Sequence, residues 1–148
     1  MILAGRAIND YMPRHVAQLT IKSLNEASKI IKGSKVLIMG LTFKENVDDT
    51  RETPVKEIIK ELKEFQCEIY GYDPMISKEE IEKFSIKSLD NLNNIKVDCV
   101  IITVVHDYFK TISLDNLIDI MNIHPILIDV RGFYSDEAEK KDIIYQKL

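Results

Sequence analysis

Residues 35–54 read KVLIMGLTFKENVDDTRETP, and this stretch decides how the rest of the chain is interpreted. It opens with an apolar run, Val36–Met39, passes into a polar segment that begins at Gly40, and ends at Pro54, where helical spacing begins. An apolar run, a loop led by glycine and a helix form the pattern of a strand in an α/β sheet. The sequence therefore predicts a buried strand with a loop at its carboxyl end.

The loop between Gly40 and Pro54 is longer than its position requires, since strand-to-helix connections normally take only a few residues. It contains the cations Lys44 and Arg51. In open α/β sheets, ligands bind beyond the carboxyl ends of the strands, and a Lys or an Arg placed there suits a phosphate group. A charged loop is also often just a solvated surface with ion pairs. Both interpretations stay open at this point.

Strands and helices are predicted to alternate after this loop. Helical spacing predicts helices over residues 54–65, 77–84 and 114–121. Apolar or alternating runs predict strands over residues 67–72, 97–105 and 126–130, with a very short strand at Ile86. Residues 88–94 are interpreted as a helical turn, and residues 132–148 as a charged tail with a weak helix over 135–141. This alternation predicts a Rossmann-like, doubly wound parallel α/β sheet.

The start of the chain predicts one long helix, because apolar residues recur at helical spacing between residues 2 and 31. Pro13 lies inside this pattern. We expect it either to kink the helix or to mark its start near Met12, with Asp10 as the N-cap. Gly33 is expected to follow the end of the helix.

The long helix needs a partner for its apolar face, which includes Val16, Leu19 and Leu24. That partner is either the sheet or a second copy of the chain. We therefore divide the chain into a helix, residues 1–33, and a sheet domain, residues 34–148.

Composition excludes several classes of function. The chain has 148 residues and a net charge of −4, which gives no basic surface for nucleic acid. No apolar stretch is as long as a membrane span and no signal peptide is visible, so we expect a cytoplasmic protein. Cys67 and Cys99 lie in predicted strands and are interpreted as small buried hydrophobes in a reducing compartment. His15 and His124 show no spacing typical of a metal site, so no metal is expected.

Three motifs together resemble one known family. GLTFK at Gly40–Lys44, followed by DDTRE at Asp48–Glu52, resembles the signature of the UDP-glucose/GDP-mannose dehydrogenase family. The match is to its C-terminal domain, which binds the nucleotide-sugar. NDYMP at Asn9–Pro13 resembles the central helix of the family, and DVR at Asp129–Arg131 resembles a late Asp-x-Arg element. The motifs cover nearly the whole chain in the expected order.

This resemblance implies roles for individual residues. Lys44, Phe43 and Arg131 are expected to bind the UDP-sugar, and Arg51 is expected to reach the pyrophosphate of NAD held by a different domain. Each residue has a simpler alternative. Lys44 could be a surface cation, and Phe43 could pack down to anchor the loop. Arg51 could pair with an aspartate of its own loop, Asp49 being favoured over Asp48, and Arg131 could pair with Asp129.

Asp73 and His106 follow predicted strands and invite other interpretations. An acid after a second strand is where NAD-binding folds hold the adenine ribose, but the first strand here lacks the G-x-G-x-x-G loop. Asp73 is therefore interpreted as a turn and cap residue. His106 follows the most apolar predicted strand, where it could touch a ligand or serve in capping and packing.

The resemblance also implies an activity. Enzymes of this family oxidise the C6 alcohol of a sugar to a carboxylate with NAD, through a cysteine nucleophile, in polysaccharide biosynthesis. Neither cysteine here has the Gly-x-Cys-x-Pro context of that nucleophile, so no catalytic residue is assigned. The expectation is an inactive UDP-sugar-binding fragment that dimerises through its first helix, with UDP-N-acetyl-D-mannosamine favoured by residues 9–13. The alternatives are a Rossmann-like interaction module that binds no nucleotide and a plain NAD-binding domain.

Overall fold

A computed structural model describes residues 2–148, with side chains from Met12 onward. Six strands form one parallel sheet in the order β3-β2-β1-β4-β5-β6. The strands are β1 (Lys35–Met39), β2 (Glu68–Tyr72), β3 (Lys87–Ser88), β4 (Cys99–Ile102), β5 (Ile126–Asp129) and β6 (Ile144–Lys147). This order is that of a doubly wound, Rossmann-type sheet, which confirms the predicted fold class.

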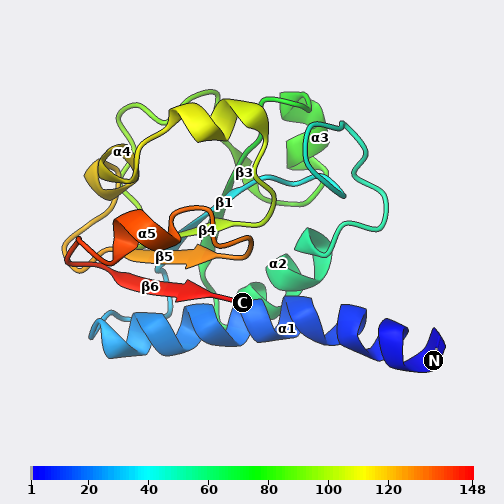
Figure 1. The fold of residues 1–148 in the computed structure, drawn as a ribbon, viewed down its shortest axis with the longest axis horizontal. Helices are drawn as coiled ribbons and strands as arrows, with labels where there is room; N and C mark the ends of the chain where they lie inside the picture. The colour runs from blue at the N-terminus through cyan, green and yellow to red at the C-terminus, as the bar shows by residue number, and fades with distance from the viewer. Residues whose placement is uncertain (1) are drawn as a thin grey trace.

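Helices cover both faces of the sheet (Figure 1). They are α1 (Ile2–Glu26), α2 (Val55–Glu64), α3 (Lys78–Glu82), α4 (Leu114–Asp119) and α5 (Ser135–Ala138), with a short 3₁₀ helix, η1 (Asp107–Thr111). Residues of α1, α2 and α3 share one hydrophobic cluster with one face of the sheet, and residues of η1, α4 and α5 share a second cluster with the other face. Across the described residues, no helix is both long and apolar enough to pass through a membrane.

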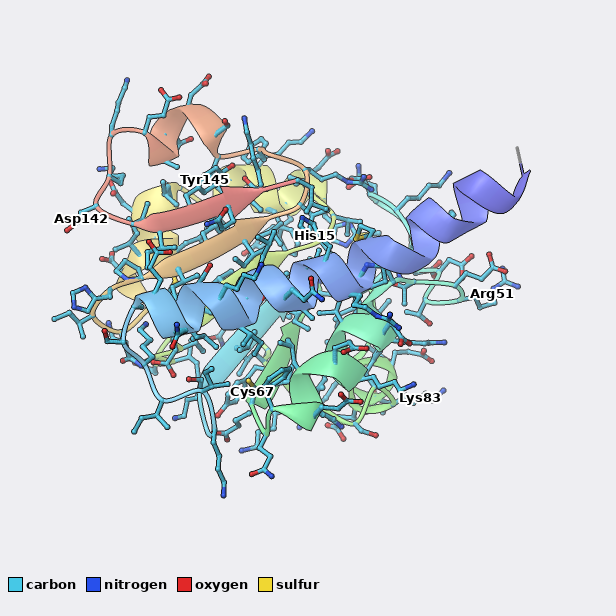
Figure 2. The ribbon with its side chains drawn as sticks, turned by 90° about the horizontal axis from the view of Figure 1, so that it is seen from below. His15, Arg51, Cys67, Lys83, Asp142 and Tyr145 are labelled. Carbon is cyan, nitrogen blue, oxygen red and sulfur yellow. The ribbon has the colours of Figure 1, made fainter. Side chains whose placement is uncertain are left out.

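The topology explains why α1 packs on the sheet. Right-handed crossovers place α2 on one face and α4 and α5 on the other, because the chain moves in opposite directions from the central strands. The face that carries α2 therefore has no crossover helix above β4 and β5. α1 fills that place, in contact with α2, β4 and β5 (Figure 2), and buries Val16 and Leu24 completely. The sheet is thus the partner that the apolar face of this helix required.

The limits of α1 differ from the sequence prediction. The helix runs through Pro13 without interruption, so the predicted start near Met12 with Asp10 as N-cap is wrong. It ends at Glu26, several residues before Gly33. Ser28 adopts a left-handed conformation, with φ 60°. Its N–H donates to the Asn25 carbonyl and the next N–H donates to the Leu24 carbonyl, which closes the helix in the Schellman arrangement.

Other predicted elements are shorter or different. Ser88 belongs to β3 and residues 89–94 contain bends and turns, so the helical turn predicted over residues 88–94 is wrong. The short strand predicted at Ile86 is found one residue later, as β3. The tail forms a sixth strand, β6, which pairs with β5 and was not predicted. Pro54 occupies the N-cap position of α2, and the Thr53 hydroxyl accepts a long hydrogen bond of 3.4 Å from the Val55 N–H.

Candidate functional site

The loops that follow β1, β2, β4 and β5 meet at one edge of the sheet, because all the strands are parallel. They bring together Lys44, Asp73, His106 and Arg131, which come from these loops in that order. The β1 loop lies at the point where the crossovers diverge to opposite faces. Ligands of open α/β sheets bind in this place.

A buried pair, Asp73 and His106, joins the loops beneath this edge. Only 3% of Asp73 and 1% of His106 is exposed. One Asp73 oxygen, Oδ2, accepts hydrogen bonds from the Leu41 N–H at 2.7 Å and from His106 Nε2 at 3.0 Å. The other, Oδ1, accepts one from the Met75 N–H at 2.8 Å. Asp73 is a turn residue, as predicted, and it also links the β2 loop to the β1 and β4 loops.

The second ring nitrogen of His106 contacts the β1 loop. His106 Nδ1 lies 2.9 Å from the Asn46 backbone N–H, which is a donor, so this nitrogen accepts and carries no proton. The proton of the neutral ring is then on Nε2, where the Asp73 carboxylate accepts it. The Asn46 side chain in turn accepts from the Asp107 N–H at 2.8 Å. His106 therefore serves in packing and hydrogen bonding and is covered from solvent.

The β1 loop is folded against the sheet by its own residues. Leu41 is completely buried, and the Phe43 N–H donates to the Asp49 carbonyl at 2.7 Å. The Thr53 hydroxyl donates to the Thr42 carbonyl at 3.3 Å, which ties the end of the loop to its beginning. The loop therefore has a defined shape, with Leu41 rather than Phe43 as its apolar anchor.

Phe43 and Lys44 lie on the outside of this loop. Phe43 is 48% exposed, so the alternative in which it packs down as an anchor is wrong. Lys44 is exposed, and within the described part of the chain its ammonium takes part in no ion pair. Both side chains are accessible to a ligand at the carboxyl edge.

Arg131 lies at the same edge as Lys44, because it follows β5, which is parallel to β1. Its Nε lies 2.9 Å from Glu45 Oε2, and the same oxygen accepts a hydrogen bond from the Val105 N–H at 3.2 Å. Burial raises the pKa of Glu45, but backbone N–H donors and Arg131 outweigh that effect, and the pKa lies below its ordinary value. The alternative partner of Arg131, Asp129, is completely buried and accepts hydrogen bonds elsewhere, so that alternative is wrong.

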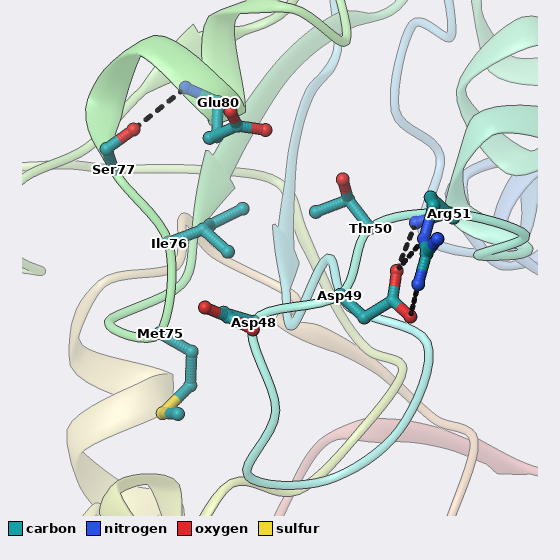
Figure 3. Close-up of a pocket in the computed structure, with 8 residues that line it drawn as sticks. All are labelled: Asp48, Asp49, Thr50, Arg51, Met75, Ile76, Ser77 and Glu80. Atoms are coloured by element: carbon teal, nitrogen blue, oxygen red, sulfur yellow. Dashed lines mark hydrogen bonds and ion pairs between the residues drawn. The ribbon is translucent and has the colours of Figure 1, made fainter.

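Arg51 pairs with Asp49, as the simpler alternative for this residue predicted. Two nitrogens of the guanidinium contact the two carboxylate oxygens, at 3.1 Å and 3.2 Å (Figure 3). The Arg51 side chain is exposed and the Asp49 side chain is partly exposed. The hydrogen bond from Arg51 lowers the pKa of Asp49.

Two depressions border this loop. The larger, of about 560 Å³, is lined by Asp48, Asp49, Thr50, Arg51, Met75, Ile76, Ser77 and Glu80. The smaller, of about 300 Å³, is lined by Phe43, Asp49, Arg51 and Glu52. The structure thus brings Phe43 and Arg51 to one depression, whereas Arg131 contacts Glu45.

The two cysteines are buried, as predicted. Burial raises the pKa of the Cys67 thiol to about 11, and burial raises the pKa of Cys99 as well. Both thiols are therefore protonated at neutral pH and are poor nucleophiles. Among the described residues, no cluster of His, Cys, Asp or Glu has the arrangement of a metal site.

The parallel sheet and the residues at its carboxyl edge together define a class of protein. It is an α/β domain of nucleotide-binding type with cations on the loop after its first strand. The chain belongs to the UDP-glucose/GDP-mannose dehydrogenase family, whose UDP binding domain matches residues 37–136. This confirms the resemblance seen in the sequence.

Known relatives extend beyond this chain. It is 32% identical to the UDP-N-acetyl-D-glucosamine 6-dehydrogenase of Salmonella typhi, over 98% of this chain and 31% of that protein. It is 37% identical to the UDP-N-acetyl-D-mannosamine dehydrogenase of Methanococcus maripaludis, over 80% of this chain and 26% of that protein. The fold matches the NDP-N-acetyl-D-galactosaminuronic acid dehydrogenase of Methanosarcina mazei Go1, with a TM-score of 0.84 and 23% sequence identity. The matched region covers 98% of this chain and 30% of that chain. The chain thus spans a quarter to a third of the length of these relatives.

Sequence reasoning missed the partners that shape the site. Neither Glu45 nor Asn46 is marked by its sequence context as a partner of a site residue. Asp73 and His106 were recognised at strand ends, which is the signal that marks them, but their pairing was not predicted. That pairing depends on the strand order β2-β1-β4, which brings both residues beside the β1 loop.

Proposed function

We propose that this chain is the C-terminal, substrate-binding part of an NAD-dependent UDP-sugar dehydrogenase. The observation that carries the proposal is the β1 loop. It holds the family motif, it is fixed at the carboxyl edge of the central strand, and it leaves the Lys44 ammonium exposed there. An ammonium ion in this position suits the diphosphate of a nucleotide-sugar.

In this proposal the substrate is a UDP-N-acetylhexosamine. Relatives named for UDP-N-acetyl-D-glucosamine and for UDP-N-acetyl-D-mannosamine support this class. We favour UDP-N-acetyl-D-mannosamine because of the Asn9–Pro13 motif. Lys44 contacts the diphosphate or the sugar, and Phe43 lines the pocket. Arg131 exchanges Glu45 for an anionic group of the substrate.

Arg51 is assigned to NAD. Its guanidinium is exposed and directed away from the sheet core, where it can meet a pyrophosphate held by a domain outside these residues. NAD, when bound, accepts the hydride from the substrate. The cysteines described above are buried and protonated, so we assign no catalytic residue and expect no dehydrogenase activity from these residues alone.

Titration calorimetry of the chain with UDP, the two UDP-N-acetylhexosamines and NAD tests the proposal. We expect a response to the uridine ligands, and a loss of about tenfold or more in affinity for Lys44→Ala, because a charge-assisted contact is removed. Lys56→Ala, an exposed position on α2, is the matched control and should bind normally. A response to NAD alone would favour a plain NAD-binding domain, and no response to any ligand would favour an interaction module.

We also propose that residues 1–33 form a dimerisation helix and that residues 34–148 form the nucleotide-sugar-binding domain of a cytoplasmic enzyme of polysaccharide biosynthesis. The N-terminal end of α1 extends past the sheet, where a second copy can reach it (Figure 2). Light scattering of the intact chain at several concentrations tests this, since removal of α1 would uncover the core. A mass of 17.1 kDa at every concentration would contradict the dimer.

A further inference from the structure

We propose that His106 is a positioning residue: its Nδ1 atom, by accepting the Asn46 N–H, holds the β1 loop in the shape that presents Lys44. The role of the loop in binding rests on the function proposed above. The shape of the loop, and the part that His106 plays in it, can be tested without a ligand.

The first argument is the position of the ring between loops. His106 is the last residue of the connection from β4 to η1, at the N-cap position of η1, and its two nitrogens face different neighbours. Nε2 contacts Asp73 in the β2 loop at 3.0 Å, and Nδ1 contacts the Asn46 N–H in the β1 loop at 2.9 Å. One side chain therefore joins three strand-end loops at the edge where ligands bind.

The second argument is that the direction of these bonds is fixed. Asp73 accepts two backbone N–H donors, so it is held in one orientation and offers an acceptor to the ring. Nε2 of His106 must then donate, and Nδ1 of the neutral ring is left as an acceptor that faces Asn46. Asp73 thus selects the tautomer that can hold the loop, as a carboxylate does for many functional histidines.

The third argument is that the ring contacts the loop on both sides of Lys44. The Thr42 hydroxyl lies 3.4 Å from His106 Nε2 and donates to the Lys44 carbonyl at 2.9 Å. Two residues after Lys44, Asn46 turns the chain with a φ of 60°, in the left-handed region that asparagine adopts more readily than most residues with a side chain. The Asn46 N–H donates to His106 Nδ1 within this turn, and without that bond the turn after Lys44 is no longer attached to the ring.

A role in packing alone is the competing explanation. The ring is almost fully buried and lies 5.2 Å from the Phe109 ring, measured between centroids. If His106 only fills space, any polar replacement of similar size should affect the loop to the same degree. If His106 positions the loop, a replacement that keeps an acceptor in the place of Nδ1 should affect the loop less than one that keeps a donor in the place of Nε2.

A matched pair of substitutions separates the two explanations. In His106→Asn the amide oxygen takes the place of Nδ1 and can accept the Asn46 N–H. In His106→Gln the amide nitrogen takes the place of Nε2 and can donate to Asp73, but no acceptor faces Asn46. We expect His106→Asn to keep UDP affinity close to wild type and His106→Gln to lose about tenfold. Equal binding by wild type and both variants, or equal loss in both variants, would overturn the proposal.

Amide hydrogen exchange of residues 42–52, measured without ligand, keeps this test separate from the proposed function. Fast exchange in the loop of His106→Gln, with slow exchange in His106→Asn and wild type, supports the positioning role even if no form binds UDP. Equal loop exchange in all three overturns it. If the wild type binds no UDP, the proposed function fails on its own.

A measurement on the unaltered chain covers the case in which a variant does not fold. Nitrogen NMR of the His106 ring should show a protonated Nε2 and an unprotonated Nδ1 that is coupled to the Asn46 amide. The opposite tautomer would overturn the proposal, because Nδ1 could then not accept.

Discussion

Each of the two edges of the sheet contains an aspartate that binds the surrounding loops. At one edge a cation contacts this aspartate, and at the other edge the cations lie away from it. At the amino edge, Asp98 accepts from the Lys35 N–H at 2.8 Å and from the Asn122 amide at 3.0 Å. Lys29 folds onto this aspartate, with its ammonium 3.8 Å from Asp98 Oδ1 and 2.9 Å from the Asp98 carbonyl. Burial lowers the pKa of Lys29, although Asp98 opposes the shift.

At the carboxyl edge, the corresponding aspartate, Asp73, is paired with a neutral histidine, and the cations remain outside. Lys44 and Arg51 are exposed, whereas the side chain of Lys29 is only 10% exposed. The amino edge is therefore a closed structural junction, in which cation and carboxylate satisfy each other. The carboxyl edge keeps its shape through hydrogen bonds that uncharged donors, the ring and the backbone, make to Asp73, which leaves the Lys44 ammonium available to a ligand.

The largest expected effect comes from the glycines at the two ends of β1. A Cβ added at Gly40, which has φ +90°, would lie 2.7 Å from Val104 Cγ2 and 2.9 Å from the Val104 carbonyl oxygen. At Gly33, with φ +83°, nothing lies within 4 Å. Gly40→Ala should therefore lose about 3 kcal/mol of unfolding free energy, from strain and overpacking, and Gly33→Ala about 1 kcal/mol, from strain alone. Urea unfolding measures both, and equal losses would show that the carboxyl edge is not tightly packed.

A smaller effect is expected at the two aspartates. Asp73→Asn places an amide N–H₂ group where a buried carboxylate now accepts from backbone N–H groups and His106, and should cost about 2 kcal/mol. Asp98→Asn is the matched change at the amino edge, where the side chain is 20% exposed and water can replace lost partners. Asp98→Asn should lower the free energy of unfolding by about 1 kcal/mol. Thermal unfolding of both variants tests this order, and the reverse order would contradict the comparison.

The smallest effect is the pH dependence of the Glu45–Arg131 pair. Against the effect of burial, backbone N–H donors and, after them, Arg131 hold the pKa of Glu45 below its ordinary value in the folded chain, so the ionised Glu45 side chain stabilises the fold above that ordinary value. The contribution is lost as the pH falls through the folded pKa. Glu45→Gln should therefore be less stable than wild type at neutral pH and equal to it in acid. Glu64→Gln, at an exposed position on α2, controls for the loss of one charge, and a difference that grows in acid would contradict the assignment.

Sequence periodicity predicted the elements whose burial pattern is strong. β4 is fully buried and α2 buries Val55, Ile58, Ile59 and Leu62 at helical spacing, and both were predicted. β6 was missed because an edge strand is only half-buried and carries a mixed sequence. The end of α1 was misplaced because Ser28, rather than a glycine, adopts the left-handed conformation that closes the helix.

The candidate site was predictable only where strand ends alone determine position. Lys44 and Arg131 each follow a strand that the sequence predicts, and parallel strands end at one edge, so their shared edge follows from the predicted fold class. The contact between Arg131 and Glu45 joins residues 86 positions apart in the chain, and it depends on side-chain directions that no local pattern encodes. The same limit applies to the contact between His106 and the Asn46 N–H.

The carboxylates that accompany both arginines have a consequence for selectivity. Glu45 pairs with Arg131 and Asp49 pairs with Arg51, so these two arginines do not bind small anions indiscriminately. A ligand that binds either arginine has to displace the carboxylate that is paired with its guanidinium. A small or weakly charged ion gains little binding free energy from that exchange. A rigid molecule with several negative oxygens can contact more than one cation at once and gains more. Competition from within the loop thus acts as a filter for multiply charged ligands.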